Sequence, residues 1–323
     1  MTRAGTHTHL RAGAAFALGA LVAAMAAGKA PATTPGKNGR MVFTQQVGTW
    51  TQLFTIEPDG TGLKQVTHFD DSDSSNGNWS PGGKRIVFER NFPTNHVGIY
   101  TINANGGDLR SLTPVRKGFY EGAPAYSPDG KKVIFARGRC ATLDCDGPRD
   151  RSGLFTRNVD GTRVRAITPP QPIGPISKRS FDHPQFSPDG KRVAYIERVG
   201  EHNAAVFVVK LHGGKPKRLT SFRMGVDDRV DWSPDGSLIL FGDNYRGVDV
   251  YTIRPNGSGL KRIYRTTRWN YSPDSWSPDG RRIMIKRGAY GNADIDVMNA
   301  DGTGLRPVTH GLNVGGGSWG THP

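Results

Sequence analysis

Cysteine is scarce in this chain, with only Cys140 and Cys145 among 323 residues. Four residues separate the two thiols in a polar segment. A metal site, the alternative interpretation, lacks a second ligand pair at suitable spacing. In an exported protein, a disulfide that closes this small loop is the simpler interpretation. We therefore expect Cys140 and Cys145 to be bonded to each other.

Sustained helical periodicity and long apolar runs are also lacking outside the N-terminus. The apolar run at residues 14–27 follows Arg3 and Arg11 and ends in small residues, which is typical of a secretory signal peptide. The run is short for a membrane span, which needs about 20 apolar residues. We expect a signal peptide at 1–28, a flexible lead-in at 29–38, and a secreted or periplasmic mature chain without a transmembrane segment. An uncleaved N-terminal anchor is the alternative.

A repeated phrase organises the rest of the chain. Residues 276–280 read Trp-Ser-Pro-Asp-Gly, and the same phrase, with an aromatic residue first, begins at Trp79, Tyr126, Phe186 and Trp232. Serine, proline and glycine suit the first, second and fourth positions of a type I turn. A short apolar run follows each copy and reads as a β-strand. Each unit is too small to bury its own faces, so neighbouring copies must pack together.

A second phrase occurs six times and marks another hairpin in each unit. It begins with Asp-Gly, Asn-Gly or Gly-Gly and ends in an apolar residue that is usually followed by threonine, as at residues 59–67 and 301–309. Such dipeptides between apolar runs are strong hairpin signals. Each unit therefore carries four strands.

The missing sixth copy of the first phrase shows how the array closes. The chain begins, after its lead-in, with the strand that should follow a proline turn, and ends near Trp319 with the strand that should precede one. The spacing between the aromatic positions is even, apart from 60 residues between Tyr126 and Phe186, where the cysteine loop is inserted. We predict an all-β, six-bladed β-propeller at 39–323, with four-stranded antiparallel blades. Its ring is closed by the C-terminal strand joining the N-terminal blade, which hides the sheet edges.

These phrases resemble the TolB-like propeller repeats of exported bacterial proteins, and the resemblance covers residues 39–323. It implies a six-bladed propeller but specifies function weakly. Gly82 stands where the repeat usually has aspartate. TolB's own N-terminal α/β domain has no counterpart in the sequence, so TolB's role in the outer-membrane Tol–Pal system does not transfer directly.

Enzyme motifs find little support in the sequence. Residues 316–320 match the Gly-x-Ser-x-Gly elbow of hydrolases, but that elbow needs a following helix and later catalytic partners, so Ser318 is assigned to the closing strand. Residues 71–82 resemble a calcium loop but have Asn76 and Gly82 where glycine and glutamate are needed. The histidines form no paired ligand motif like the metal-binding histidine cluster of the lyases that share this fold.

The candidate site consists of unrepeated polar residues just ahead of each aromatic, where the innermost strands begin at the mouth of the central channel. Repeat geometry brings these segments to one rim, and such mouths commonly bind ligands. The alternative is that the side chains cap strand ends and hold channel water. The candidates are Asp73, Asn76, Tyr120, Glu121, Asp182, His183, Asp227, Asp228, Arg229, Asn270, Tyr271, Asp274 and Asn313.

Basic residues exceed acidic ones, 43 to 28, and recur at equivalent repeat positions. A ring of positive charge favours anionic partners such as cell-wall polymers, lipid headgroups or nucleic acid. Export makes nucleic acid an unexpected partner, and the alternative is that the charges are solvated and protect edge strands from aggregation.

We expect a monomeric, noncatalytic binding scaffold for a protein or an anionic envelope polymer, acting through the channel mouth or the basic face. A metal-dependent polysaccharide lyase or a hydrolase is the alternative. No cofactor is expected, with a divalent cation in the channel as the alternative.

Overall fold

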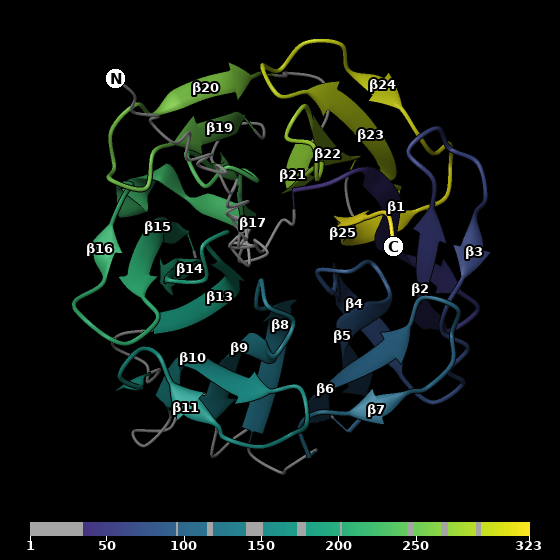
Figure 1. Cartoon of the computed structure of the whole chain (residues 1–323), viewed down its shortest axis with the longest axis horizontal. Helices are drawn as coiled ribbons and strands as arrows, with labels where there is room; N and C mark the ends of the chain where they lie inside the picture. The colour runs from purple at the N-terminus through teal and green to yellow at the C-terminus, as the bar shows by residue number, and fades with distance from the viewer. Residues whose placement is uncertain are drawn as a thin grey trace, which may run out of the picture.

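Six antiparallel sheets surround a central axis in the computed structural model (Figure 1). The structure describes residues 35–94, 96–114, 119–139, 151–172, 179–200, 202–243, 249–265, 271–288 and 292–323. Cys140, Cys145 and Asn270 lie outside the described residues, so the predicted disulfide stays a prediction. The six-bladed, all-β propeller expected from the repeats is confirmed.

Each blade runs from an inner strand beside the axis to a short strand at the rim. The blade that contains both chain ends has β25 (Val314–Thr321), β1 (Asn38–Val47), β2 (Trp50–Ile56) and β3 (Lys64–Gln65). The next has β4 (Asp73–Trp79), β5 (Arg85–Phe92), β6 (His96–Asn103) and β7 (Arg110–Ser111). The third has β8 (Phe119–Tyr126), β9 (Lys132–Arg139), β10 (Arg151–Asn158) and β11 (Arg165–Ala166), with β12 (Gln171–Pro172) also on β10.

The last three blades follow the same order. The fourth has β13 (Arg179–Phe186), β14 (Arg192–Val199), β15 (Asn203–Lys210) and β16 (Lys217–Arg218). A short 3-10 helix, η1 (Phe222–Met224), leads to β17 (Val226–Trp232), β18 (Ile239–Asp243), β19 (Val250–Ile253) and β20 (Lys261–Tyr264). The sixth has β21 (Tyr271–Trp276), β22 (Arg282–Arg287), β23 (Asp294–Asn299) and β24 (Arg306–Pro307).

The Ser-Pro-Asp-Gly phrase forms a hydrogen-bonded turn between the first two strands of a blade. In one copy the Ser127 hydroxyl donates to Asp129 over 2.6 Å and accepts from the Lys132 amide over 2.8 Å. The Lys131 amide also donates to Asp129, over 3.0 Å. Gly130 has φ +67°, a left-handed conformation that glycine adopts without steric cost. The repeated residues therefore encode this turn directly.

The aromatic residue ahead of the turn packs between blades. Trp232 is fully buried among Ala194, Ile196 and Val206 of the preceding blade and Phe241 of its own. All six repeated aromatic residues are buried. Because each one fills the space between two sheets, its burial stabilises the packing of neighbouring blades.

Closure of the ring follows the split repeat. β25 pairs with β1, with Trp319 opposite Met41, and the Trp319 indole donates to the Gly39 carbonyl over 2.9 Å. A Cβ at Gly320 would lie 2.6 Å from the Trp79 ring, so glycine here admits the aromatic residue of the next blade. Figure 1 shows β25 beside β1. The predicted closing strand, including the assignment of Ser318 to it, is confirmed.

The disc has two distinct faces. Proline turns and Asp/Asn-Gly hairpins share one of them, because in four blades the end of the third strand bonds to the residue after the proline turn, as Val159 N does to Lys131 O over 3.0 Å. We call this the turn face. The inner strands begin on the opposite side, which we call the mouth face and which includes Asp73, Tyr120 and Asp182 at the starts of β4, β8 and β13.

Candidate functional site

The inner strands leave regular register shortly before their aromatic residues. Register shifts fall between Ser75 and Asn78 in β4 and at corresponding places in β8, β13, β17 and β21. Asn76, Ala123 and His183, each three residues before its aromatic, have φ of 53°, 51° and 44°. Non-glycine residues seldom adopt this conformation, and β-bulges of this kind redirect side chains. The bulge therefore recurs from blade to blade, whereas the side chains that it presents differ between blades.

Three of the predicted site residues meet around one amide oxygen in the channel. The Arg229 guanidinium donates to Asn76 Oδ1 over 2.8 Å, and His183 Nε2 lies 3.3 Å from the same oxygen. These residues come from β4, β13 and β17, which are separated by more than 100 residues of sequence between Asn76 and either partner. The structure therefore brings Asn76, His183 and Arg229 together, as the repeat geometry predicted.

A buried carboxylate that the sequence analysis missed supports this group. Glu89, on β5, accepts hydrogen bonds from Asn76 Nδ2 over 2.6 Å, from Ser75 Oγ over 2.8 Å and from the Ala123 amide. Burial raises the pKa of Glu89, and these hydrogen bonds and the Arg229 charge only partly oppose it. Equivalent strand positions hold Thr44, Ala136, Ile196, Gly242 and Lys286. A comparison between copies at this register would have singled out Glu89.

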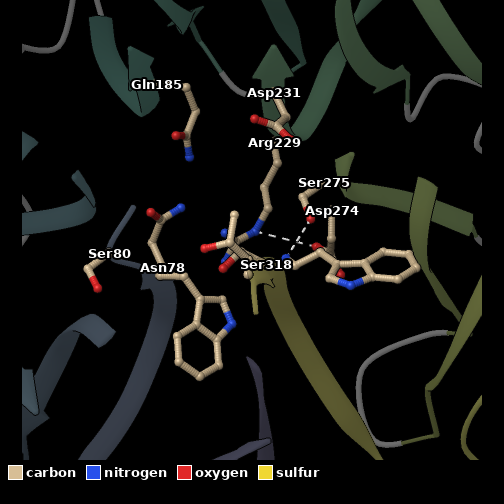
Figure 2. Close-up of a pocket in the computed structure, with 12 residues that line it drawn as sticks. Asn78, Ser80, Gln185, Arg229, Asp231, Asp274, Ser275 and Ser318 are labelled. Carbon is tan, nitrogen blue, oxygen red and sulfur yellow. Dashed lines mark hydrogen bonds and ion pairs between the residues drawn. The ribbon is translucent and has the colours of Figure 1, made fainter. Parts of the chain in front are cut away.

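A second layer of polar side chains lies nearer the turn face. Asp274 is buried with one oxygen 3.4 Å from Arg229 Nε, and Asp231 accepts from the amides of Trp232 and Trp276 over 2.9 and 2.8 Å. Figure 2 shows Asn78, Gln185, Asp231 and Ser275 around the same space as Arg229. The cavity there measures about 20 Å³, which has room for one water molecule.

Glycine at position 316 helps to shape this layer. A Cβ there would lie 3.0 Å from Asp274 Oδ1 and 3.1 Å from Arg229 Nε. Any side chain would therefore crowd the ion pair. The Ser318 hydroxyl, also lining the cavity, is buried with no hydrogen-bond partner among the described residues. A water molecule in the cavity would satisfy it.

Most of the predicted carboxylates at the mouth are engaged by neighbouring strands. Asp73 accepts from the Thr51 amide over 2.6 Å, Glu121 forms an ion pair with Arg137, and Asp182 lies 2.9 Å from Arg198 Nε. These contacts fit the alternative interpretation, in which such groups stabilise strand ends. Arg137 and Arg198 were not among the predicted residues, although each lies opposite or close to its carboxylate in the sheet register.

The Tyr120 hydroxyl lies near Glu89, whereas the remaining predicted residues lie apart from the central group or outside the description. Tyr120 is 44% exposed, and the Glu89 charge, together with burial of the hydroxyl, raises the pKa of Tyr120 well above its ordinary value. Tyr271 is buried with its ring 5.4 Å from that of Tyr264, and burial raises the pKa of Tyr271 to about 12. Asn313 is half-buried with φ 53° just ahead of β25. The side chains of Asp227 and Asp228 are outside the description.

Metal ligands are not grouped in the part of the chain that the structure describes. No set of three or more His, Cys, Asp or Glu residues there is arranged to hold an ion. The Arg229 guanidinium also lies at the centre of the polar group, where its charge would oppose a second cation. The described residues at the mouth therefore offer hydrogen-bond donors to a ligand and not a set of ligands for a divalent metal.

Comparison with known proteins agrees with this architecture. A family model described as the TolB beta propeller domain matches residues 176–321. The protein TolB homolog of Chlorobium luteolum is 30% identical over 269 residues, covering 82% of this chain and 56% of that protein. The structure of TolB from Acinetobacter baumannii has a TM-score of 0.68 at 22% identity, covering 88% of this chain and 67% of that one.

In its repeats and its fold this propeller is TolB-like. An oligogalacturonate lyase solved with manganese shares the fold alone, with a TM-score of 0.55 at 12% identity and coverage of 88% and 90% of the two chains. This chain spans between 23% and 61% of the length of four curated relatives that it matches. Among its described residues, no helix is long and apolar enough to cross a membrane.

Proposed function

We propose that this propeller is an exported, noncatalytic binding scaffold that holds a segment of a protein or of an anionic envelope polymer at the channel mouth. The observation that carries the proposal is the convergence of Asn76, His183 and Arg229 on one point through bulged inner strands. Left-handed residues at such positions cost free energy and are commonly retained at binding sites. Ala123 adopts the same conformation without a polar side chain, so the bulge belongs to the fold and the polar groups belong to the site.

The chemistry of this mouth suits ligands that accept hydrogen bonds. Arg229 supplies a fixed fork of donors, and its neighbour His183 adds a ring nitrogen. The carboxylates nearby are held by Arg137 and Arg198, so they add little net negative charge. A carboxylate or carbonyl of a polymer or peptide chain therefore matches the group.

Site-specific photocrosslinking tests the proposal. A photoreactive residue at the exposed position of Tyr120 should capture a partner in a cell-envelope fraction, whereas the same group at Leu260 on the turn face should not capture that partner. Adding Asn76→Gly, which keeps the left-handed backbone accessible but deletes the amide, should reduce capture at position 120 about tenfold, as expected for losing a buried hydrogen-bonded group. Equal capture by both positions, or capture unaffected by Asn76→Gly, would contradict recognition at the mouth.

The alternative, a metal-dependent lyase or hydrolase, makes a different prediction for the same purified chain. Titration with Mn²⁺ followed by calorimetry should show binding that depends on mouth carboxylates if that alternative holds. We expect no heat of binding from the mouth, with Asp182→Asn giving the same calorimetric trace as the wild type.

Removal of the signal peptide is tested separately. N-terminal sequencing of the exported protein should place its first residue after position 28 if the signal peptide is removed.

A further inference from the structure

Apolar side chains recur on the turn face at equivalent hairpin positions. Leu63, Leu109, Val164 and Leu260 are 45%, 41%, 43% and 51% exposed, and each comes directly before a basic residue that begins a rim strand. The rim strands β3, β7, β11 and β20 lie around the circumference of the disc (Figure 1). Four exposed apolar groups are thus spread around a single face. Single exposed apolar residues are common on protein surfaces, but these four occupy equivalent repeat positions on one face and so form a regular arrangement.

Lys64, Lys217 and Arg306 on the rim strands keep their charge exposed, whereas Arg110, which follows Leu109, forms an ion pair with Asp108 over 2.8 Å. Lys64 and Lys217 donate to the main-chain carbonyls of Asn105 and Asn256 in the next blade, over 3.4 and 2.8 Å. Arg306 makes the same kind of contact with Pro58 over 3.1 Å. Because the acceptors are neutral, these contacts orient the cations without cancelling their charge.

A second circle of cations follows the proline turns, closer to the axis. Lys84, Lys131, Lys191 and Arg281 are exposed. None of these four forms an ion pair with a carboxylate within the described parts of the chain. The turn face therefore has two concentric sets of positive charge.

Carboxylates on the turn face are mostly held within their own turns. Asp59 and Asp160 accept from the neighbouring threonine, and hydrogen bonds from Thr61 and Thr162 lower the pKa of each. Ion pairs occur on both faces, as between Arg85 and Asp108 on the turn face and, on the mouth face, between Arg90 and Asp71 and between Arg287 and Asp296. The turn face therefore carries exposed cations that form no ion pair among the described residues, namely Lys64, Lys217, Arg306 and the four that follow the proline turns.

We propose that the turn face docks onto the surface of an anionic lipid bilayer. Leu63, Leu109, Val164 and Leu260 would enter the headgroup region while the adjacent cations meet lipid phosphates, the combination that binds proteins to membrane surfaces. A soluble polyanion would be attracted by the cations but would gain nothing from the apolar ring. This inference goes beyond the proposed function, since it uses the opposite face and leaves the channel mouth open to a partner.

Vesicle sedimentation with residues 29–323, which contain the whole described propeller, tests the inference. The protein should sediment with phosphatidylcholine vesicles that contain phosphatidylglycerol and not with pure phosphatidylcholine, and added salt should weaken binding. Combining Leu63→Ser, Leu109→Ser and Leu260→Ser should reduce partitioning at least about tenfold, and so should combining Lys131→Glu, Lys191→Glu and Lys261→Glu. Thermal unfolding checks that both variants remain folded.

Matched controls separate this face from the mouth. Val47→Ser removes an apolar side chain of similar exposure, 41%, from the mouth end of β1, and it should leave sedimentation unchanged. Asn76→Gly should also leave it unchanged, so failure at the mouth and failure at the turn face are distinguishable. Absence of sedimentation with anionic vesicles overturns the inference. So does a triple-serine variant that binds like the wild type while polyglutamate displaces both, because that result would identify a soluble polyanion as the ligand.

Discussion

The two ends of each inner strand differ in what their residues do. At the turn end, the aromatic residue and the Ser-Pro-Asp-Gly phrase are nearly the same in five of the blades, and their contacts repeat, as Ser127 and Ser187 show with Asp129 and Asp189. At the mouth end the backbone bulge is repeated but the side chains are not. The difference shows that repetition in this chain encodes folding, whereas departures from repetition locate the candidate site.

Removing the closing strand should cause the largest loss of stability at the turn end of the inner strands. Deletion of residues 317–323 takes Trp319 from a cluster with Met41, Phe43 and Met284 and removes most of the pairing between β25 and β1. Loss of a buried tryptophan alone costs about 3–5 kcal/mol, so the melting temperature should fall by roughly 10 °C or more. Differential scanning calorimetry checks this, with deletion of residues 322–323 as the control. An unchanged melting temperature would contradict ring closure by β25.

Glu89 gives the corresponding test at the mouth end. Glu89→Ala would leave the buried Ala123 amide and the Asn76 side chain without their acceptor, which should cost about 2–4 kcal/mol of unfolding free energy. Urea unfolding measures the loss. Ala136→Ser, at the equivalent position on β9, is a control that should change stability much less. A similar cost for both would show that Glu89 has no special role in the mouth.

The pH dependence of Glu89 sharpens the same comparison. Burial raises the folded-state pKa of Glu89 above its unfolded value of about 4.3. Its contribution is therefore fully present below that value and is lost as pH rises through the raised folded-state pKa. The stability of wild type relative to Glu89→Gln should fall over this range, and unfolding curves at several pH values check it. A constant difference across the range would show that the carboxyl does not titrate abnormally.

The fold could be predicted almost completely from the sequence because its signals are local and repeated. A turn such as residues 127–130 contains its own hydrogen-bond partners, and the split repeat ending near Trp319 defines the closure. The site was predictable only in part. Asn76, His183 and Arg229 could be placed near one another by counting back from the aromatic residues. Glu89 differs from its counterparts in the other copies, but its role could not be predicted because it depends on contacts from two other strands.

Gly82 offers the smallest expected effect, and it tests whether the repeated phrase acts by the contacts seen at Asp129. A Cβ at Gly82 meets no atom within 4 Å, and Gly82 is not in the left-handed region, so aspartate fits there. Gly82→Asp should add acceptors for the Ser80 hydroxyl and the Lys84 amide and stabilise the protein by about 1 kcal/mol. Gly82→Ala separates the backbone entropy gain from these bonds.

The direction of the pH effect distinguishes hydrogen bonds made by an aspartate at position 82 from the backbone effect of replacing glycine. Burial would raise the pKa of the equivalent Asp129, but hydrogen bonds from Ser127 and the Lys131 amide outweigh burial and lower it. An aspartate at position 82 with the same partners would therefore stabilise the protein above its unfolded pKa of about 3.9 and lose that effect as pH falls through the lower folded value. Thermal unfolding from neutral to acid pH measures the gain relative to Gly82→Ala. If aspartate gains no more than alanine at neutral pH, the repeated aspartate does not act through the hydrogen bonds of its turn.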